Sequence, residues 1–460
     1  MNGNYAFVVD RDSVGVAGTA LRPLQVALLG FGTVGRSVTR ILVERPELGG
    51  RLQLTHVFNR RVSRKRADWV PESVTWTEDL DELFASDPDV IVEVVGGVRP
   101  AGDWVRRALE RGISVVTANK MLLAAEGPAL LHLAASTGAQ IRFEAAVGGG
   151  VPLVQGVREG LAGDTLTRVI GILNGTSNYI LSRMKTGDAS MDAVLDEARR
   201  LGYAEADPSA DIDGDDAAAK LVVLAGIAFG RHLPLAAVPR RSIRSIAAAD
   251  FRYAARLGCT IRQIALVEAA ADGADALHAF VGPALVPAGS SFGRNEGADN
   301  IVMLCGRYGG SSSFSGAGAG GPATAVAVVS DLLALAERRT SGPNRAPEGR
   351  PSPLVPGVGL PAPRAWEAGT LVATSERPYY LRFVVRDAPG ILASIASALA
   401  REGINLDAVL QDPGYPKDAL VFVVTVEPCE EFALNTALRA IAGAECHSDP
   451  PLALPMLLGV

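Results

Sequence analysis

The residues best suited to proton chemistry lie in the stretch GYAEADPSADIDGDDAAAK, which gathers acidic side chains and ends on Lys220. Asp216 and Lys220 are four residues apart, so on a helix they share one face. We expect this helix to begin near Asp213 to Asp215, where acidic side chains favour a helix start. Lys220 then heads the apolar segment LVVLAGIAFG. A partly buried lysine can transfer protons near neutral pH, whereas an exposed helix ion pair is the alternative interpretation.

The spacing of Asp211, Asp213 and Asp215 is superficially that of a calcium-binding loop. Such a loop needs glycine at its sixth position and a bidentate glutamate at its twelfth. Here Gly214 comes before the sixth position and Val222 occupies the twelfth, so the pattern excludes an EF-hand.

A second candidate site is the turn GFGTVG, in which Gly30, Gly32 and Gly35 lie directly between an expected strand and an expected helix. The first glycine permits a tight turn, the second lets the backbone approach a pyrophosphate, and the third lets helix and strand pack closely. Backbone N–H groups at the helix start then face the anion. The sequence predicts a dinucleotide site; a glycine-rich turn of another α/β fold is the alternative.

The end of the next expected strand bears on the choice between NAD and NADP. An NAD site usually places an acidic residue there to take the ribose hydroxyls. This strand ends without an acid and is followed by five cations, Arg60, Arg61, Arg64, Lys65 and Arg66. The sequence therefore favours NADP, with a solvated basic turn as the alternative.

Lys120 follows the apolar run VVTAN, where the carboxyl edge of a parallel sheet is expected. Open α/β sheets bind ligands at this edge. A functional lysine and a solvated lysine at a helix start both fit this position.

The elements that must position these residues are strands and helices in alternation, and the strands are nearly continuous in apolar character. This pattern predicts an α/β fold with a Rossmann-type, doubly wound parallel sheet. The expected division is an N-terminal extension (1–23), a dinucleotide-binding domain (24–150, completed by 306–340), an α+β substrate domain (151–305), a Pro- and Gly-rich linker (341–375) and a small α+β domain (376–460).

Composition argues against several classes of partner and site. A hydrophobic content of 48% with 20% charged residues is typical of a globular protein, and the net charge of −6 argues against a nucleic-acid partner. The sequence has neither a signal peptide nor an apolar run long enough to span a membrane, so a cytoplasmic location is expected. The cysteines lack CxxC spacing, which predicts neither a zinc site nor a disulfide framework; they are Cys259, Cys305, Cys429 and Cys446.

Six stretches, in this order, resemble those of homoserine dehydrogenases: GFGTVG, TANK, FEAAVGGGVP, ILNGTSNYIL, LGYAEADPSADIDGDDAAAK and GAGAGGPATA. Beyond them, a strand-DAPG-helix-GINL pattern resembles an ACT domain, a small-molecule-sensing module. The resemblance implies NAD(P)-dependent interconversion of L-homoserine and L-aspartate 4-semialdehyde in threonine and methionine biosynthesis. It also implies a homodimer or homotetramer, with the substrate domain mediating dimerisation.

The resemblance carries roles onto matching residues. Lys220 would be the acid/base residue, and Lys120 a second active-site lysine near cofactor and substrate. Glu205, Asp211 and Asp216 would bind or orient the amino-acid part of the substrate and the lysine. Positions that match cofactor contacts are Gly30, Phe31, Gly32, Thr33, Val34, Gly35, Arg60, Lys65, Lys120, Gly202 and Gly320.

Two ligands besides the cofactor are implied. A structural sodium ion would be held at the hinge by backbone oxygens of Glu144, Val147, Gly149 and Val151. Threonine or a related amino acid would act on the terminal domain near Asp387–Gly390 and 403–406; the alternative is that this domain only mediates oligomerisation.

Two other functions stay open on the sequence. One is a different semialdehyde or amino-acid dehydrogenase with the same nucleotide domain. The other is a ligand-sensing regulator with an inactive nucleotide domain, although a regulator would not need an intact Asp216 and Lys220. Aspartate-semialdehyde dehydrogenase would need a catalytic cysteine, and neither Cys259 nor Cys305 has a suitable local setting.

Overall fold

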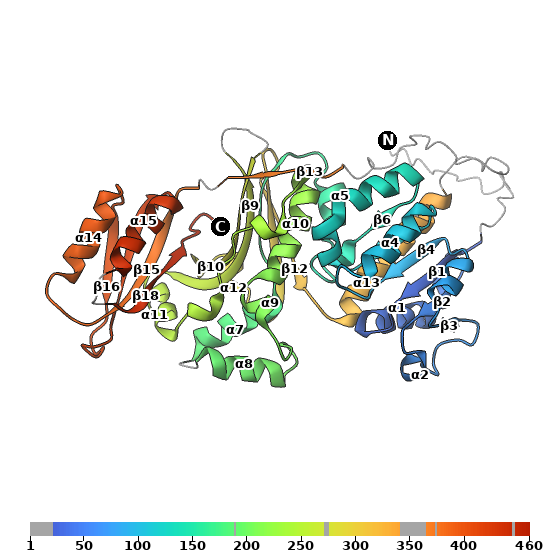
Figure 1. The fold of residues 1–460 in the computed structure, drawn as a ribbon, viewed down its shortest axis with the longest axis horizontal. Coiled ribbons are helices and arrows are strands. Elements are labelled where there is room, and N and C mark those ends of the chain that lie inside the picture. The colour runs from blue at the N-terminus through green and yellow to red at the C-terminus, as the bar shows by residue number, and fades with distance from the viewer. Residues whose placement is uncertain (1–21, 188–189, 271–275, 341–364, 373–374, 444–446) are drawn as a thin grey trace, which may run out of the picture.

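The computed structural model describes residues 22–187, 190–270, 276–340, 365–372, 375–443 and 447–460. Three bodies follow one another along the long axis of the molecule (Figure 1). We call them the nucleotide domain, the central domain and the C-terminal domain. Within the described residues, no helix has both the length and the apolar character required to cross a membrane.

The nucleotide domain is built on a six-stranded sheet with the order β3-β2-β1-β4-β5-β6, in which all neighbouring strands are parallel. Its strands are β1 (Leu24–Leu29), β2 (Leu52–Phe58), β3 (Thr75–Thr77), β4 (Val90–Glu93), β5 (Ser114–Thr117) and β6 (Ile141–Arg142). The intervening helices include α1 (Thr33–Glu44), α3 (Leu80–Ala85), α4 (Ala101–Glu110) and α5 (Lys120–Thr137). The apolar runs of β1 and β4 are buried on both faces of this sheet, which confirms the predicted doubly wound fold.

A helix from much later in the chain completes this domain. Helix α13 (Gly321–Thr340) packs on α1 so closely that a Cβ on Gly321 would lie 2.9 Å from the carbonyl oxygen of Thr33. Strand β12 (Ser311–Ala317), which precedes α13, instead pairs with β11 (Asp299–Gly306) in the central domain.

The central domain carries a second sheet with the order β12-β11-β7-β9-β10-β14. Its long strands are β7 (Leu166–Ile172), β9 (Cys259–Ala269) and β10 (Ala276–Pro287), and its short edge strand is β14 (Thr370–Leu371). The helices beside it are α7 (Gly175–Thr186), α8 (Met191–Arg200), α9 (Ser209–Ile212), α10 (Asp215–Phe229), α11 (Ala248–Arg256) and α12 (Ser291–Arg294). Antiparallel pairing dominates, so the fold class changes from the nucleotide domain as expected.

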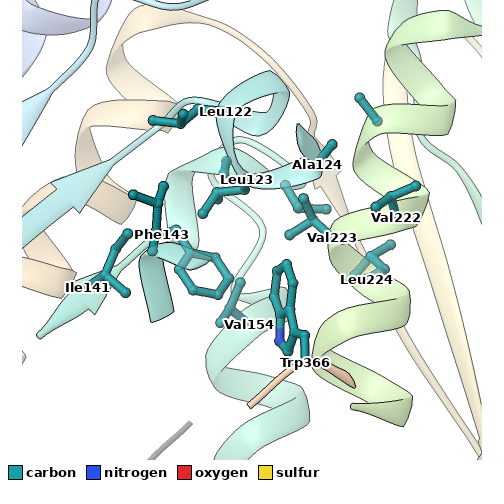
Figure 2. Packing of buried hydrophobic residues seen from close by; sticks show 14 of the residues in the cluster. Leu122, Leu123, Ala124, Ile141, Phe143, Val154, Val222, Val223, Leu224 and Trp366 are labelled. Atoms are coloured by element: carbon teal, nitrogen blue, oxygen red, sulfur yellow. The ribbon is translucent and has the colours of Figure 1, made fainter. Parts of the chain in front are cut away.

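Helices α5 and α10 meet across the boundary between these two domains, and Trp366 lies between them (Figure 2). A Cβ on Gly127 of α5 would lie 2.5 Å from the Trp366 ring, and one on Gly226 of α10 would lie 2.4 Å from it. Trp366 belongs to the stretch expected as a linker. The described part of that stretch, 365–372, adds β13 (Glu367–Ala368), which pairs with β8 (Arg231–His232), and β14 at the edge of the central sheet.

The C-terminal domain is a four-stranded antiparallel sheet with the order β16-β17-β15-β18. Its elements are β15 (Arg377–Val385), α14 (Ile391–Arg401), β16 (Leu406–Gln411), β17 (Leu420–Cys429), α15 (Glu431–Ala442) and β18 (His447–Pro455). The sheet docks on the central domain through a buried ion pair of 2.6 Å between Arg382 and Asp250 of α11. Tyr380 donates a hydrogen bond of 2.8 Å to the same carboxylate.

The thiols of Cys259, Cys305 and Cys429 are free. The expectations for Cys446 and for most of the N-terminal extension and the linker concern residues outside those described.

Candidate active site

Lys220 lies in the second turn of α10, and its side chain is only 10% exposed. Its ammonium Nζ donates a hydrogen bond of 2.6 Å to the carbonyl oxygen of Leu173, at the end of β7. It also lies 2.9 Å from Oδ2 of Asp216, one turn earlier on the same helix. The Asp216 side chain is 14% exposed, so this pair is far more buried than a solvated helix ion pair.

The other oxygen of the Asp216 carboxylate contacts a second lysine, Lys120. Lys120 is the first residue of α5, which Asn119 caps by accepting a hydrogen bond from the N–H of Leu122. Its Nζ lies 2.9 Å from Oδ1 of Asp216. Burial alone would raise the pKa of Asp216, but the ammonium groups of Lys220 and Lys120 hold this pKa well below its ordinary value. The carboxylate thus stays ionised and joins lysines from two domains.

Asn174 is a member of the site to which the sequence analysis gave no role. It is the N-cap of α7, and its Oδ1 accepts a hydrogen bond of 2.8 Å from the N–H of Ser177. Its Nδ2 donates to Asp211 at 2.6 Å and to Asp216 at 2.9 Å. The available signal was its place between an apolar strand and the helix start NGTS, where N-caps occur.

Asp211 lies beside Asp216, and hydrogen bonds hold both its carboxylate and its backbone carbonyl. Its carboxylate accepts from Asn174, and its carbonyl oxygen accepts a hydrogen bond of 3.0 Å from Nε2 of Gln263. Ser177 in turn donates to Gln263 at 2.7 Å. Burial is the main reason why the pKa of Asp211 is raised. The two adjacent acids therefore have pKa values shifted in opposite directions.

The remaining acids of the stretch lie away from Lys220. Glu205 is exposed on the loop before α9 and has no polar contact with a described residue. The other three acids accept hydrogen bonds that stabilise this stretch. Asp207 accepts one of 3.1 Å from the N–H of Ser209, Asp213 one of 3.0 Å from Nε of Arg244, and Asp215 one of 2.7 Å from Nη1 of Arg240.

The glycine turn has the geometry of a phosphate-binding turn. Gly30 has a φ of +102°, and its N–H donates a hydrogen bond of 3.0 Å to Phe58, the last residue of β2. A Cβ on Gly35 would lie 2.2 Å from the Gly30 carbonyl oxygen, whereas a Cβ on Gly32 would meet nothing within 4 Å. The side of Gly32 is therefore open for close approach of a pyrophosphate, as a dinucleotide site requires.

The side chains around this turn differ in what they can contact. Phe31 is fully buried against Trp76, with a ring distance of 4.7 Å, so only its backbone can face a cofactor. Val34 is half-buried and Thr33 is exposed at the helix start. Gly320 has a φ of +113° and precedes α13, next to α1.

The five cations after β2 are exposed, and none of them forms an ion pair with a described residue. They are Arg60, Arg61, Arg64, Lys65 and Arg66. The hydrogen bond from Gly30 to Phe58 places the end of β2 next to the glycine turn. Gly202 has a φ of +79° and lies on the exposed loop after α8, in the central domain.

The turn from Glu144 to Val151 joins the nucleotide and central domains. Gly149 has a φ of +61°, and the carbonyl oxygen of Val151 accepts a hydrogen bond of 2.8 Å from the N–H of Leu153. The Glu144 carboxylate accepts from the N–H groups of Val154 and Gln155, each at 2.8 Å. Burial raises the pKa of Glu144 to about 7. Val147 is fully buried. The part of the chain described here contains no cluster of acidic, His and Cys side chains that could hold a metal ion.

Family models match most of the chain. The model described as "Homoserine dehydrogenase" matches residues 152–333, and "Homoserine dehydrogenase, NAD binding domain" matches residues 30–144. An ACT domain model matches residues 379–445.

Full-length relatives and solved structures agree with these models. Homoserine dehydrogenase from Mycobacterium leprae is 39% identical over 434 residues, which cover 92% of this chain and 95% of the relative. The relative from Pseudomonas aeruginosa is 35% identical, with 94% and 98% covered. The crystal structure of a homoserine dehydrogenase from Thiobacillus denitrificans superposes with a TM-score of 0.84 at 32% identity, covering 95% of this chain and 98% of that one. A hyperthermophilic archaeal homoserine dehydrogenase mutant in complex with NADPH gives a TM-score of 0.59 at 26% identity, covering 69% of this chain and 98% of that one. The chain therefore belongs to the homoserine dehydrogenase family of NAD(P)-dependent oxidoreductases and carries a C-terminal ACT domain.

Proposed function

We propose that the protein interconverts L-homoserine and L-aspartate 4-semialdehyde, with Lys220 as the acid/base residue. The observation that carries this assignment is the buried Lys220 ammonium, which is held by Leu173 and Asp216 at 2.6 and 2.9 Å. A lysine ammonium has three N–H donors, and these two contacts use two of them. The third is available for the oxygen of a substrate.

In the direction of reduction, Lys220 donates a proton to the aldehyde oxygen as that carbon gains a hydride. When bound, NAD(P)H would supply this hydride, and in the reverse direction NAD(P)⁺ would accept it. In oxidation, neutral Lys220 receives the hydroxyl proton. Asp216 stays ionised throughout and holds the lysine ammonium in place at 2.9 Å. Lys120 shares this carboxylate and lies at the sheet edge where cofactor and substrate would meet.

The substrate carries an ammonium group, and two acids are suited to it. Asp211 lies next to Asp216 and is oriented by Asn174. Glu205 is exposed on the loop that precedes α9, and its carboxylate is free to pair with an ammonium group. We assign both to the amino-acid part of the substrate, with Asp216 orienting Lys220.

Initial rates of L-homoserine oxidation test the assignment. Lys220→Ala is expected to lower kcat by at least about a hundredfold, the lower range for a general acid/base residue. Lys185→Ala, which removes an exposed lysine of α7, is the matched control and should leave the rate unchanged. If the unaltered chain oxidised other amino-acid alcohols but not homoserine, the substrate assignment would be wrong.

For the cofactor we propose a preference for NADP. Gly30, Gly32 and Gly35 would hold the pyrophosphate at the start of α1, and Arg60 and Lys65 would face the 2′-phosphate. The exposed, unpaired cations after β2 support this preference. Double replacement of Arg60 and Lys65 by Gln should raise the KM for NADP and leave the KM for NAD unchanged.

We also propose that a sodium ion binds at the turn between the nucleotide and central domains. Its ligands would be the carbonyl oxygens of Glu144, Val147, Gly149 and Val151. Carbonyl oxygens are suitable ligands for a hard cation, and the four residues lie within eight positions of one turn, in which Gly149 has a φ of +61°. If the ion contributes to the fold, replacing Na⁺ by tetramethylammonium at constant ionic strength should lower Tm.

We also propose that the ACT domain binds an amino-acid effector such as threonine, and that the chain assembles as a homodimer or homotetramer. The segment Asp387–Gly390 is exposed at the start of α14, and Gly403 has a φ of +71° in the turn before β16. These two turns would form the effector site. Rates measured with and without threonine, on the full chain and on a chain that ends before residue 370, test the regulation. Sedimentation measures the assembly.

A further inference from the structure

A cavity of about 200 Å³ lies outside the Lys220 site, between α5, β6, the start of α6 (Leu153–Gln155) and α13. About seven water molecules occupy this volume in liquid water. One side is apolar and includes Leu131, Ala134, Ile141, Phe143 and Val154. Figure 2 labels three of these wall residues, Ile141, Phe143 and Val154, in the core beneath α5.

Three acids line the cavity: Glu159 is exposed and accepts a hydrogen bond of 3.2 Å from Nε2 of Gln155, while Glu144 and Asp331 are already fully engaged. Both carboxylate oxygens of Glu144 accept backbone N–H groups, from Val154 and Gln155. Asp331 accepts the N–H of Glu144 at 2.8 Å with one oxygen and faces Arg142 at 3.4 Å with the other. Glu144 and Asp331 therefore have little capacity to bind a cation.

Two of the three arginines that line the cavity have no such partner in the described part of the chain. Arg158 and Arg338 line it, and neither makes a hydrogen bond or ion pair with a described residue. The Arg158 guanidinium lies 6.0 Å from the centre of the Phe143 ring. Burial, followed by repulsion from Arg142, lowers the pKa of Arg158. Arg142 faces Asp331 at 3.4 Å, whereas Arg158 and Arg338 have no ion-pair partner among the described residues, so a bound anion would meet two unpaired guanidinium groups.

We propose that this cavity binds a small monocarboxylate with an aliphatic or aromatic body. The carboxylate would pair with Arg158, since a planar guanidinium suits bidentate recognition of a carboxylate. The body of the ligand would lie against Ile141 and Phe143. Because the cavity lies outside the Lys220 site, the proposal does not depend on the reaction that the chain catalyses.

Calorimetric titration of the full-length chain with 4-methylpentanoate tests the proposal. The matched probes are 4-methylpentanamide, which has the same body without the charge, and acetate, which has the charge without the body. We expect saturable binding of one 4-methylpentanoate per chain and affinities at least about tenfold lower for both matched probes. Absence of binding at millimolar concentration, or equal affinity for acid and amide, would overturn the proposal.

Two variants then locate the ligand. Arg158→Gln removes the paired charge, and Ala134→Phe fills the apolar half; each should lower the affinity at least about tenfold. Arg200→Gln, on the surface of α8, is the control and should bind as the unaltered chain does. Unchanged Tm and circular dichroism establish that the variants are folded. Retained binding in both cavity variants would place the ligand elsewhere and contradict the proposal. If neither variant folds, the comparison of acid with amide on the unaltered chain decides.

Discussion

At the scale of single residues, one carboxylate organises the site. Asp216 contacts Lys220 with one oxygen and Lys120 with the other, both at 2.9 Å. Asn174 adds a hydrogen bond to Asp216 and another to Asp211. The position of either lysine therefore depends on the charge and orientation of Asp216.

Asn174→Asp tests this dependence. The variant keeps an oxygen to cap α7 but replaces the amide donor with a third carboxylate beside Asp211 and Asp216. Since a hydrogen bond to a charged group contributes about 1.5–3 kcal/mol, kcat/KM should fall about ten- to a hundredfold. Ser190→Ala is the matched control: it removes the side-chain cap of α8 outside the site and should lower stability without lowering kcat/KM.

The depressed pKa of Asp216 predicts how stability depends on pH. A carboxylate with a lowered folded-state pKa stabilises the fold above its unfolded-state pKa, about 3.9, and this contribution is lost as the pH falls toward the folded-state value. The free energies of unfolding of the native chain and of Asp216→Asn should differ by a constant amount from pH 8 to 5, and this difference should shrink below about pH 4. Urea unfolding across this range measures it. Asp68→Asn, an exposed control, should show no such pattern; a constant difference down to pH 3 would contradict the prediction.

The sequence was informative about this site where the contacts are local. Asp216 and Lys220 lie one helical turn apart, so their pairing follows from helix geometry alone. The partners from other segments could not be predicted in this way. The carbonyl oxygen of Leu173 and the amide of Asn174 reach the lysine and its aspartate only because β7 ends next to α10.

At the scale of elements, the glycine turn shows how two glycines of one motif serve different purposes. Gly35 is required by packing, because its Cα lies against the Gly30 carbonyl, whereas Gly32 has free space beside it. Strand, turn and helix could be predicted from the sequence because their signals are contiguous. The place of Trp366 between α5 and α10 could not, since it follows a stretch whose composition is that of a linker.

Alanine substitutions should separate the two glycines. Gly35→Ala brings a Cβ within 2.2 Å of a backbone oxygen, so it should lower Tm markedly. Gly32→Ala meets no protein atom within 4 Å and should leave Tm unchanged while raising the Kd for NADP. Differential scanning calorimetry and a fluorescence titration with NADPH measure the two effects. Unchanged NADPH affinity in Gly32→Ala would show that the pyrophosphate does not lie against this turn.

At the scale of the whole molecule, the segment 240–242 contacts both the loop and helix start that lead to Asp216 and the ACT domain. Within it, Arg240 pairs with Asp215, the first residue of α10, and Ser242 donates a hydrogen bond to Asp213, between α9 and α10. Between them, Arg241 pairs with Glu431 at the start of α15. A shift of the ACT domain can thus reach the loop through a single segment.

Arg241→Gln should weaken this connection. We expect the basal rate to stay within about twofold, while inhibition by an effector such as threonine requires a higher concentration or reaches a lower extent. Arg439→Gln is the matched control, because the side-chain hydrogen bonds of Arg439 stay within α15. Inhibition curves of the two variants measure the difference, and identical curves would show that the signal takes another route.

The return of α13 to the first domain has a consequence for synthesis on the ribosome. Strands β1 to β6 emerge first, but the helix that covers α1 ends at Thr340 of a chain of 460 residues. One face of α1 in the nascent nucleotide domain therefore stays uncovered while the central-domain strands β7 to β12 are translated. Nascent chains stalled before Gly321 should present that face to chaperones, and chains stalled after Thr340 has left the exit tunnel should not.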